Sequence, residues 1–346
     1  MGEESMSAQP LVSIITPVYN GAEDLAECIE SVLRQTYTNC DYTIVNNCST
    51  DETLAIARKY AGKDARIRIV DNDHFLPIIK NHNHAIRQIS PESKYCKFVF
   101  GDDWLYPTCV EELVRVAEEN PSIGLVGSFT MDGEEVIWGG PAYPCFKISG
   151  REVCRSKLLG GPYVFGTMTC LLVRSDLIRK RVPFFNERNL HADQEACFDV
   201  LQESDFGFVH QVLSFSRPRE QSNTSFANDF CSIALGEFVI LLKYGPVFLD
   251  RAEYQQRYKK ARWEYYRVLA HNVLRIRPNR FWKYHKDTLA AFDCRMYWGL
   301  LGVSLIADLA EHLSHPFRAV ERAWPWWSRT LNKTSKNRPA QPPSSL

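Results

Sequence analysis

The sequence has no excess of charge of either sign, because 41 Lys and Arg residues are matched by 41 Asp and Glu residues. A chain without net charge sets up no overall field that would attract nucleic acid, so we expect no nucleic-acid partner. Its eleven cysteines form no paired C-x-x-C motif. An odd number of scattered cysteines is more typical of a reducing, cytoplasmic protein than of a disulfide framework or a zinc ribbon.

Several short motifs are also missing. The sequence contains no P-loop, no glycine fingerprint of a dinucleotide site, no Ser-His-Asp elbow and no zinc motif, so these classes of site are not expected. Residues 1–10 are polar and acidic without an apolar signal core, and we expect them to be disordered. The uncharged run Met296–Ala307 has twelve residues, too few to span a bilayer, which takes about 20.

What the sequence does contain is an alternation of strand and helix patterns. Apolar residues make up 45% of the chain, enough for a folded core. We expect strands at 11–19, 42–45, 66–70 and 97–100, separated by helices at 23–36, 51–60 and 78–89. This alternation predicts a parallel, doubly wound sheet, in which ligands bind at the carboxyl ends of the strands. Those ends are Thr16–Asn20, Asn46–Ser49 and Gly101–Asp103.

The rest of the chain is predicted to change character in stages. A helix at 108–120 and a strand at 123–129 precede a stretch at 130–165 that is rich in Gly, Pro and aromatic residues, and we expect this stretch to be a loop over a site. A strand at Thr167–Val173 and helices at Ser175–Arg181 and His191–Gln202 follow. Beyond residue 226 the pattern is helical, with no clear strand.

Three segments of the first half resemble the family-2 glycosyltransferases, in the same order and at the same spacing. They are VSIITPVYNGAEDLAECIESVLRQTY, IVNNCSTDET and FVFGDDWLYP. The resemblance covers roughly residues 11–225 and implies a GT-A fold of the α/β class, with a Rossmann-like, mostly parallel sheet flanked by helices. It implies a nucleotide-binding half at 11–105 and an acceptor half at 106–225. A C-terminal all-helical region at 226–331 and a disordered tail at 332–346 complete the expected organisation.

The resemblance implies a metal site at the pair Asp102 and Asp103, and it also assigns Asp102 to the nucleotide-sugar. Carboxylates recruit a divalent cation, Mn²⁺ or Mg²⁺, that neutralises the diphosphate of such a donor. Phe100 stands where many family members carry a further Asp, so the sequence leaves open which Asp contacts the metal. Taken alone, the pair is also compatible with a solvated turn before the helix that Pro107 bounds.

Further donor contacts are implied on two loops. Pro17, Tyr19 and Asn20 fall on the nucleotide-binding loop of the family. Asn47 takes the place of an Asp that often accepts a hydrogen bond from uracil, and an amide can serve a uracil or thymine ring as donor and acceptor. The alternative for Asn47 is a plain turn residue. Asp51 is either a donor contact or a first-turn residue favoured by the helix dipole.

The proton acceptor of the reaction is predicted near residue 193. An inverting transferase needs a carboxylate that takes the proton of the acceptor hydroxyl, and the family carries it at the start of a helix roughly ninety residues past the metal pair. The match here is Asp193, with Glu195 in reserve and an ordinary helix N-terminal carboxylate as the alternative. The run Gly160–Pro162, with Gly166, resembles the acceptor-side loop of the family.

Two further features remain ambiguous in sequence. Arg217 and Arg219 either hold the diphosphate through charge-assisted hydrogen bonds or are ordinary surface residues. The C-terminal segment mixes Trp324, Trp326 and Trp327 with several Lys and Arg residues, which favours a peripheral contact with an anionic membrane on the inner face of the plasma membrane. The alternative is a helical subdomain that packs on the catalytic domain or on a second subunit of a homo-oligomer.

Together these observations predict an inverting, metal-dependent glycosyltransferase. It would move a sugar from a nucleotide-sugar donor, of the UDP or dTDP type, to a glycan or a lipid-linked acceptor in surface polysaccharide or glycolipid synthesis. Two alternatives remain: a catalytically inactive relative that binds glycan or nucleotide, and a nucleotidyltransferase on a related fold. The second would normally show a basic, glycine-rich loop near the N-terminus, and the segment VSIITPVYNGAED has no basic residue.

Overall fold

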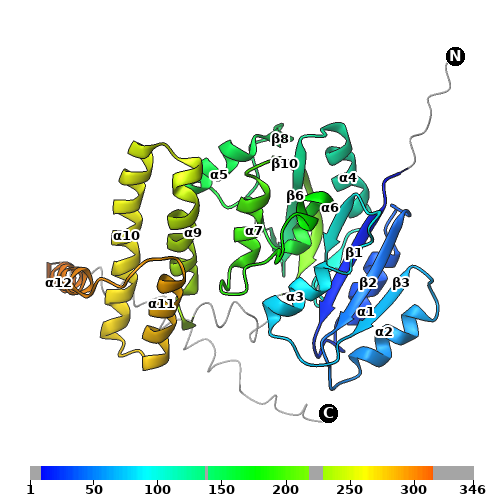
Figure 1. Ribbon diagram of the computed structural model, residues 1–346, viewed down its shortest axis with the longest axis horizontal. Coiled ribbons are helices and arrows are strands. Elements are labelled where there is room, and N and C mark those ends of the chain that lie inside the picture. The colour runs from blue at the N-terminus through cyan, green and yellow to red at the C-terminus, as the bar shows by residue number, and fades with distance from the viewer. Residues whose placement is uncertain (1–8, 137–138, 218–228, 315–346) are drawn as a thin grey trace, which may run out of the picture. The chain divides into compact units, whose positions relative to one another are not determined.

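The computed structural model describes residues 9–136, 139–217 and 229–314. The chain divides into two compact units, Met1–Tyr258 and Lys259–Leu346. The first unit is built on one mixed sheet flanked by helices, which confirms the predicted α/β class (Figure 1). Among the described residues, ten strands join this sheet. Eight of them follow the order β3-β2-β1-β4-β9-β6-β10-β5, while β7 pairs with β6 and β8 with β10.

The first half of the sheet is parallel, as the alternating pattern predicts. Its strands are β1 (Val12–Val18), β2 (Cys40–Asn46), β3 (Ile67–Asp71) and β4 (Tyr95–Phe98). The connecting helices are α1 (Leu25–Leu33), α2 (Thr53–Ala61) and α3 (Ile78–Ile86). All seven residues of β1 are buried, because helices cover this central strand and its neighbours, so its side chains belong to the core.

The second half of the sheet adds longer and antiparallel pairings. Here β6 (Ile123–Asp132) runs parallel to β10 (Asp205–Ser216), and β9 (Leu172–Arg174) lies antiparallel between β4 and β6. The short strand β5 (Trp104–Leu105) pairs with the end of β10. The accompanying helices are α4 (Cys109–Glu119), α6 (Ser175–Arg179) and α7 (Ala192–Val200).

Two predictions for residues 130–173 are wrong in detail. The expected loop contains β7 (Glu135–Val136), β8 (Lys147–Ile148) and helix α5 (Gly150–Leu158). Ser149 is the N-cap of helix α5. Its hydroxyl accepts from the backbone N–H of Glu152 at 3.2 Å. The expected strand Thr167–Val173 is instead a 3₁₀ turn, η1 (Met168–Cys170), followed by the short β9.

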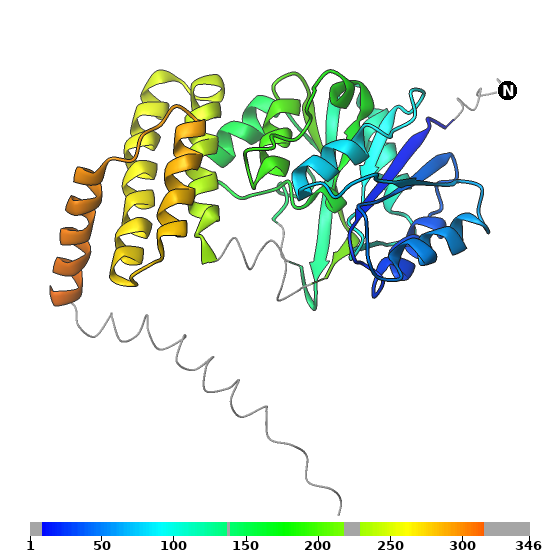
Figure 2. The same ribbon diagram turned by 60° about the horizontal axis from the view of Figure 1, so that its bottom comes forward.

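Helices alone make up the described C-terminal part of the chain, coloured yellow to orange in Figure 2. The first unit ends with α9 (Ser232–Phe248) and the start of α10 (Arg251–Leu274), and the second unit continues with α11 (Asn279–Ala291) and α12 (Trp298–Ser314). Within the second unit, the buried Tyr265 hydroxyl lies 2.8 Å from Nδ1 of His285. In the described part of the chain, no helix is both long and apolar enough to cross a bilayer. Trp324, Trp326 and Trp327 lie outside the described residues.

Candidate active site

The acidic pair lies at the carboxyl edge of the parallel strands, where ligands bind in sheets of this kind. Asp102 and Asp103 follow β4 at its carboxyl end, in the turn that leads into β5. The loop after β1 reaches the same place, because an added Cβ at Gly101 would lie 3.1 Å from Cγ2 of Val18 and one at Gly21 would lie 2.7 Å from that atom. The fold therefore brings together two of the loops that the sequence assigns to the donor.

Asp103 is held by groups from two distant segments. The Thr169 hydroxyl of η1 donates to its Oδ2 at 2.5 Å, and the Ser216 hydroxyl at the end of β10 lies 3.4 Å from the same atom. The backbone N–H of Arg217 donates to Oδ1 at 3.3 Å. Only 5% of Asp103 is exposed. Sequence reasoning did not identify Thr169 or Ser216, since no motif marks them.

Burial raises the pKa values of both residues of the acidic pair. The pKa of Asp103 is raised to about 7, chiefly by desolvation; the Thr169 hydrogen bond opposes the rise and the nearby charge of Asp102 adds to it. Burial also raises the pKa of Asp102, against the pull of the Arg217 guanidinium. Two buried carboxylates with raised pKa values at one point of the sheet are typical of a binding or catalytic site.

Arg217 lies at this site, and its side chain also contacts helix α1. Its Nε is 3.1 Å from Oδ1 of Asp24 and its guanidinium pairs with Glu27. The arginine therefore connects the end of β10 to the N-terminal end of α1, within the electrostatic reach of Asp102. Arg219, the second arginine that the sequence suggests, lies outside the described residues.

The predicted nucleotide loop is fastened to the loop after β2. Asn20 has a positive φ of 48°; its Oδ1 accepts from the backbone N–H of Thr50 at 2.8 Å, and its own N–H donates to the Ser49 hydroxyl at 2.9 Å. Asp51 accepts from the backbone N–H of Ala22 at 3.1 Å. These contacts fix the two loops against each other and give Asn20 a structural role.

Asp51 is committed to the start of helix α2. Its Oδ1 accepts from the backbone N–H of Thr53 at 3.0 Å and from the Thr53 hydroxyl at 2.5 Å. Although burial acts to raise it, hydrogen bonds from Thr53 and Ala22 keep the pKa of Asp51 below its ordinary value. The helix itself begins at Thr53, so the start expected at residue 51 is two residues early.

Asn47 is buried and already engaged by a neighbouring segment. Its Nδ2 donates to the backbone carbonyl of Leu76 at 2.8 Å, and its Oδ1 accepts from the N–H of Leu76 at 2.9 Å and from Asn72 at 3.0 Å. The Asn47 side chain thus bonds both the N–H and the carbonyl of Leu76, as a residue of a neighbouring strand does. One N–H of the Asn47 amide has no bond in this network.

Tyr19 and Pro17 lie on either side of the end of β1. Pro17 is buried within the strand, opposite Val45 of β2. Tyr19 is 49% exposed, and its ring lies 5.0 Å from that of Phe75, edge to face. Phe75 is itself 53% exposed. The two rings form an open aromatic surface beside Asn47, and sequence reasoning assigned no role to Phe75.

Asp193 lies in the first turn of α7, half-buried. Its Oδ1 accepts from the backbone N–H of Gln194 at 2.8 Å, and burial raises its pKa. The pKa of Tyr163 rises well above its ordinary range through burial and then through the charge of Asp193, so the two side chains are neighbours. Residues 163–169 therefore run from Asp193 to Thr169, which holds Asp103. Six residue steps span at most about 20 Å, so one short segment links the two predicted centres.

Glu195, the reserve candidate, is tied into a separate network. Its carboxylate accepts from Nδ2 of Asn186 at 3.0 and 3.1 Å and from Nδ2 of Asn189 at 2.7 Å. Lys243 of α9 lies 2.6 Å away. This buried carboxylate thus connects α7 to α9 and to the 186–189 loop, a structural role.

The donor set at Asp102 and Asp103 fits a hard divalent cation. Carboxylate oxygens are the ligands that Mg²⁺ and Mn²⁺ prefer, and such ions commonly take one or two carboxylates and complete their shell with phosphate oxygens and water. Among the residues that the structure describes, no group of three or more His, Cys, Asp or Glu side chains could enclose a metal. A cation here would therefore depend on the diphosphate of a substrate for its remaining ligands.

Comparison with known proteins decides the family. The family described as "Glycosyl transferase family 2" matches residues 13–181. The protein EpsE of Bacillus subtilis (strain 168), named as a glycosyltransferase, is 33% identical over 226 residues, which cover 61% of this chain and 80% of EpsE. This chain belongs to glycosyltransferase family 2. The family-2 match includes the acidic pair, whereas Asp193 lies beyond it.

Solved structures support the GT-A fold of this family-2 chain. Staphylococcus aureus TarS 1–349, solved in complex with UDP-GlcNAc, gives a TM-score of 0.60 at 16% identity and covers 82% of this chain and 80% of that one. The mannosyltransferase PcManGT of Pyrobaculum calidifontis, solved with GDP-Man and Mn²⁺, gives 0.54 at 14% identity, with coverages of 90% and 83%. Two further relatives match this chain over only 58% and 33% of their own length.

Proposed function

We propose that this family-2 glycosyltransferase is an inverting enzyme that moves a sugar from a nucleotide-sugar to a glycan or a lipid-linked acceptor, in surface polysaccharide or glycolipid synthesis. The observation that carries the proposal is the buried pair Asp102–Asp103 at the carboxyl end of β4, whose pKa values are raised and whose oxygens suit a divalent cation. A divalent cation bound between this pair and the diphosphate would offset the negative charge of both.

Asp102 and Asp103 would hold the cation, Mn²⁺ or Mg²⁺. Bound there, the ion neutralises charge on the departing nucleoside diphosphate. The chain itself contributes orientation: Thr169 and the Arg217 N–H fix the rotamer of Asp103. The Arg217 guanidinium, now paired with Asp24 and Glu27, is close enough to Asp102 to take a phosphate oxygen as a further partner.

The donor nucleotide would lie along the loops after β1 and β2, with a UDP- or dTDP-type donor favoured. The exposed ring of Tyr19 offers a stacking face for a pyrimidine. The second amide N–H of Asn47 can donate to a carbonyl of uracil or thymine. TarS was solved with UDP-GlcNAc and PcManGT with GDP-Man, so relatives of this fold take different bases, and the choice here depends on Tyr19, Asn47 and Phe75.

Asp193 would accept the proton of the attacking hydroxyl. Direct displacement at the anomeric carbon forms the new glycosidic bond and breaks the bond to the diphosphate, while the hydroxyl proton passes to the base. Burial raises the pKa of Asp193, which makes the carboxylate a stronger proton acceptor near neutral pH. A lipid-linked acceptor would bring the enzyme to the inner face of the plasma membrane.

A ligand screen with a product analysis tests the proposal. Thermal unfolding of the full chain is measured with UDP-, dTDP- and GDP-sugars, with and without Mn²⁺, because a ligand that binds the native state raises its stability. We expect one uridine or thymidine donor to raise the midpoint only when Mn²⁺ is present. Transfer to an acceptor should then give the inverted anomer by NMR and stop in excess EDTA. Full transfer in EDTA, or a product of retained configuration, would contradict it.

Binding without turnover would identify the inactive relative instead. In that case the same donor stabilises the protein, yet neither transfer nor slow donor hydrolysis is detected with any acceptor. Asp193→Asn serves as the matched control, since a true transferase loses activity in this variant while keeping the donor-induced shift in unfolding temperature.

A further inference from the structure

Helix α12 (Trp298–Ser314) of the second unit has its polarity reversed. Among the side chains of this helix that the structure describes, up to residue 310, the fully buried ones are Leu301, Ser304 and Asp308, and two of these are polar. Asp308 is 5% exposed and pairs with Arg267 of α10 at 3.3 Å. The opposite side is apolar and exposed: Trp298 at 61%, Val303 at 56%, Ile306 at 69% and Leu309 at 42%.

This arrangement differs from that of a surface helix in water. Such a helix turns its apolar stripe toward the core and its charged face toward solvent. In α12 the ion pair Asp308–Arg267 faces inward, while four large apolar side chains separated by three to five residues face outward. A single exposed apolar residue needs no explanation, but a continuous apolar stripe marks a contact surface. The exposed face of α12 therefore requires an apolar partner.

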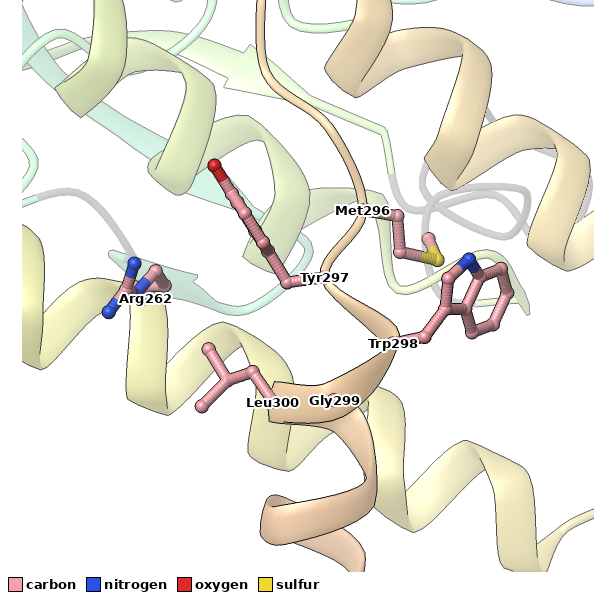
Figure 3. Close-up of a pocket in the computed structure, with 6 residues that line it drawn as sticks. All are labelled: Arg262, Met296, Tyr297, Trp298, Gly299 and Leu300. Atoms are coloured by element: carbon pink, nitrogen blue, oxygen red, sulfur yellow. The ribbon is translucent and has the colours of Figure 1, made fainter.

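The start of the same helix opens into a cavity of about 420 Å³ (Figure 3). Its lining comes from Arg262 of α10 and from residues 296–300. The Arg262 guanidinium lies 6.0 Å from the centre of the Tyr297 ring, and Tyr297 is 50% exposed. Figure 3 shows Trp298 pointing away from Arg262 and Tyr297. Aromatic rings beside a cation are typical of the boundary between apolar and aqueous phases.

The charges of the chain are separated between its two units. Residues 259–346 carry 16 Lys and Arg against 6 Asp and Glu, whereas residues 1–258 carry 25 against 35. The neutral total thus hides a net charge of +10 on the second unit and −10 on the first. A basic segment next to an exposed apolar helix favours an anionic lipid surface, which attracts Lys and Arg within a Debye length.

We propose that α12 docks the protein on an anionic bilayer, with Trp298, Val303, Ile306 and Leu309 inserted at the boundary between headgroups and acyl chains. A helix of 17 residues is about 25 Å long, and an interfacial helix lies in the plane of the membrane. This docking goes beyond the proposed sugar transfer and does not depend on which donor or acceptor is used.

Charge argues against the two other occupants of this face. A second copy that docked through the same helix would bring its own second unit, of net charge +10, against the second unit of this copy. Like charges at an interface oppose association. Residues 315–346 carry six Lys and Arg against one Glu, so they too add charge of the same sign. An anionic lipid surface combines an apolar interior with charge of the opposite sign.

Vesicle flotation with the full chain tests the docking. Vesicles of pure phosphatidylcholine are compared with vesicles that contain phosphatidylglycerol, at low and at high salt. We expect the protein to float with the anionic vesicles at low salt and to be released by high salt. Ile306→Glu should weaken this binding about tenfold or more, because it places a charge among the inserted side chains. Circular dichroism checks that the exposed substitution leaves the helices folded.

The matched control is Ile233→Glu, which makes the same change at a 54% exposed isoleucine of α9 in the first unit. This variant should bind vesicles as the wild type does. The proposal is overturned if the wild type stays unbound with anionic vesicles at low salt, or if Ile306→Glu binds them equally well. It is also overturned if the wild type is a dimer by light scattering that Ile306→Glu dissociates, since a second copy then covers the face.

Discussion

Asp103 is a buried carboxylate whose raised pKa links the stability of the fold to pH. Its pKa of about 7, set first by burial and then by Asp102, lies well above the ordinary value of 3.8. A group whose pKa is raised in the folded state contributes its full stabilisation when the pH is below the pKa of the unfolded state. That stabilisation is lost as the pH rises through about 7. The metal-free protein should therefore lose stability between about pH 4 and pH 7 through this residue.

The substitution Asp103→Asn tests this electrostatic cost. Without metal at pH 8, the variant should be more stable than the wild type by up to about 4 kcal/mol, less whatever is lost with the hydrogen bonds from Thr169 and Arg217. Urea unfolding in EDTA measures the difference. At pH 4, where Asp103 of the wild type is protonated, the difference should vanish. The variant should also lose the stabilisation that Mn²⁺ gives the wild type. Lower stability at pH 8 would contradict this account.

Asp193, the proposed proton acceptor, and Glu195, which is held by Asn186, Asn189 and Lys243, can be told apart by experiment. Asp193→Asn keeps the size and removes the proton acceptor, so transfer should fall about 10²–10⁴-fold while the donor Kd stays the same. Glu195→Gln breaks the ion pair with Lys243. It should therefore lower the unfolding temperature and leave the transfer rate per folded molecule nearly unchanged. Steady-state kinetics and calorimetry measure both effects. A wild-type rate in Asp193→Asn, with loss of activity in folded Glu195→Gln, would reverse the assignment.

At the scale of elements, the turn η1 connects the core to the acidic pair. Lys97 of β4 is fully buried, and its ammonium donates to the backbone carbonyls of Thr169 and of Leu171, the latter at 3.2 Å. Thr169 then donates to Asp103 and accepts from the backbone N–H of Phe100 at 3.2 Å. A charged side chain inside the sheet thus positions the turn that orients a proposed metal ligand.

Removing the ammonium should loosen this turn. Lys97→Met keeps an unbranched chain but leaves two buried carbonyls without their donor, which should cost about 2–3 kcal/mol of unfolding free energy. The apparent affinity for Mn²⁺, read from its effect on the unfolding midpoint, should weaken as well. Lys94→Met is the matched control, because Lys94 is half exposed and its pair with Glu118 contributes little. Equal effects in the two variants would show that the buried amine does not position η1.

The parts of the site that local patterns specify could be predicted, and the parts that tertiary contacts specify could not. The apolar run at 11–19 predicts β1, and the residues after β4 place the acidic pair at the carboxyl edge of the sheet. Thr169 is 66 residues from Asp103 in sequence, and no spacing rule joins them. In the sequence, Asn47 could not be distinguished from a turn residue, because the backbone that it bonds, that of Leu76, is 29 residues away. Helix α5 has an N-cap at Ser149, a signal that the aromatic and glycine residues nearby obscured.

At the scale of the whole molecule, a neutral total charge is misleading. The sum over the chain predicts no overall field, and that conclusion holds only for distances larger than the protein. Within it, the acidic first unit contains every described candidate donor contact, while the basic second unit contains α12. The proposed catalysis and the proposed docking therefore involve different units, and we expect each to be disturbed without the other.

Hydrogen exchange tests this division. Donor and Mn²⁺ bind only the native state of the first unit in our assignment, so they should suppress the local openings that expose amides at 19–22, 47–53, 101–104 and 167–170. At a ligand concentration of about 100 Kd, the stabilisation of about 2.7 kcal/mol slows such exchange up to about 100-fold. Amides at 259–314 should exchange at unchanged rates, and the same donor with Asp103→Asn gives the baseline. Comparable protection in 259–314 would show that the two units respond to the donor as one body.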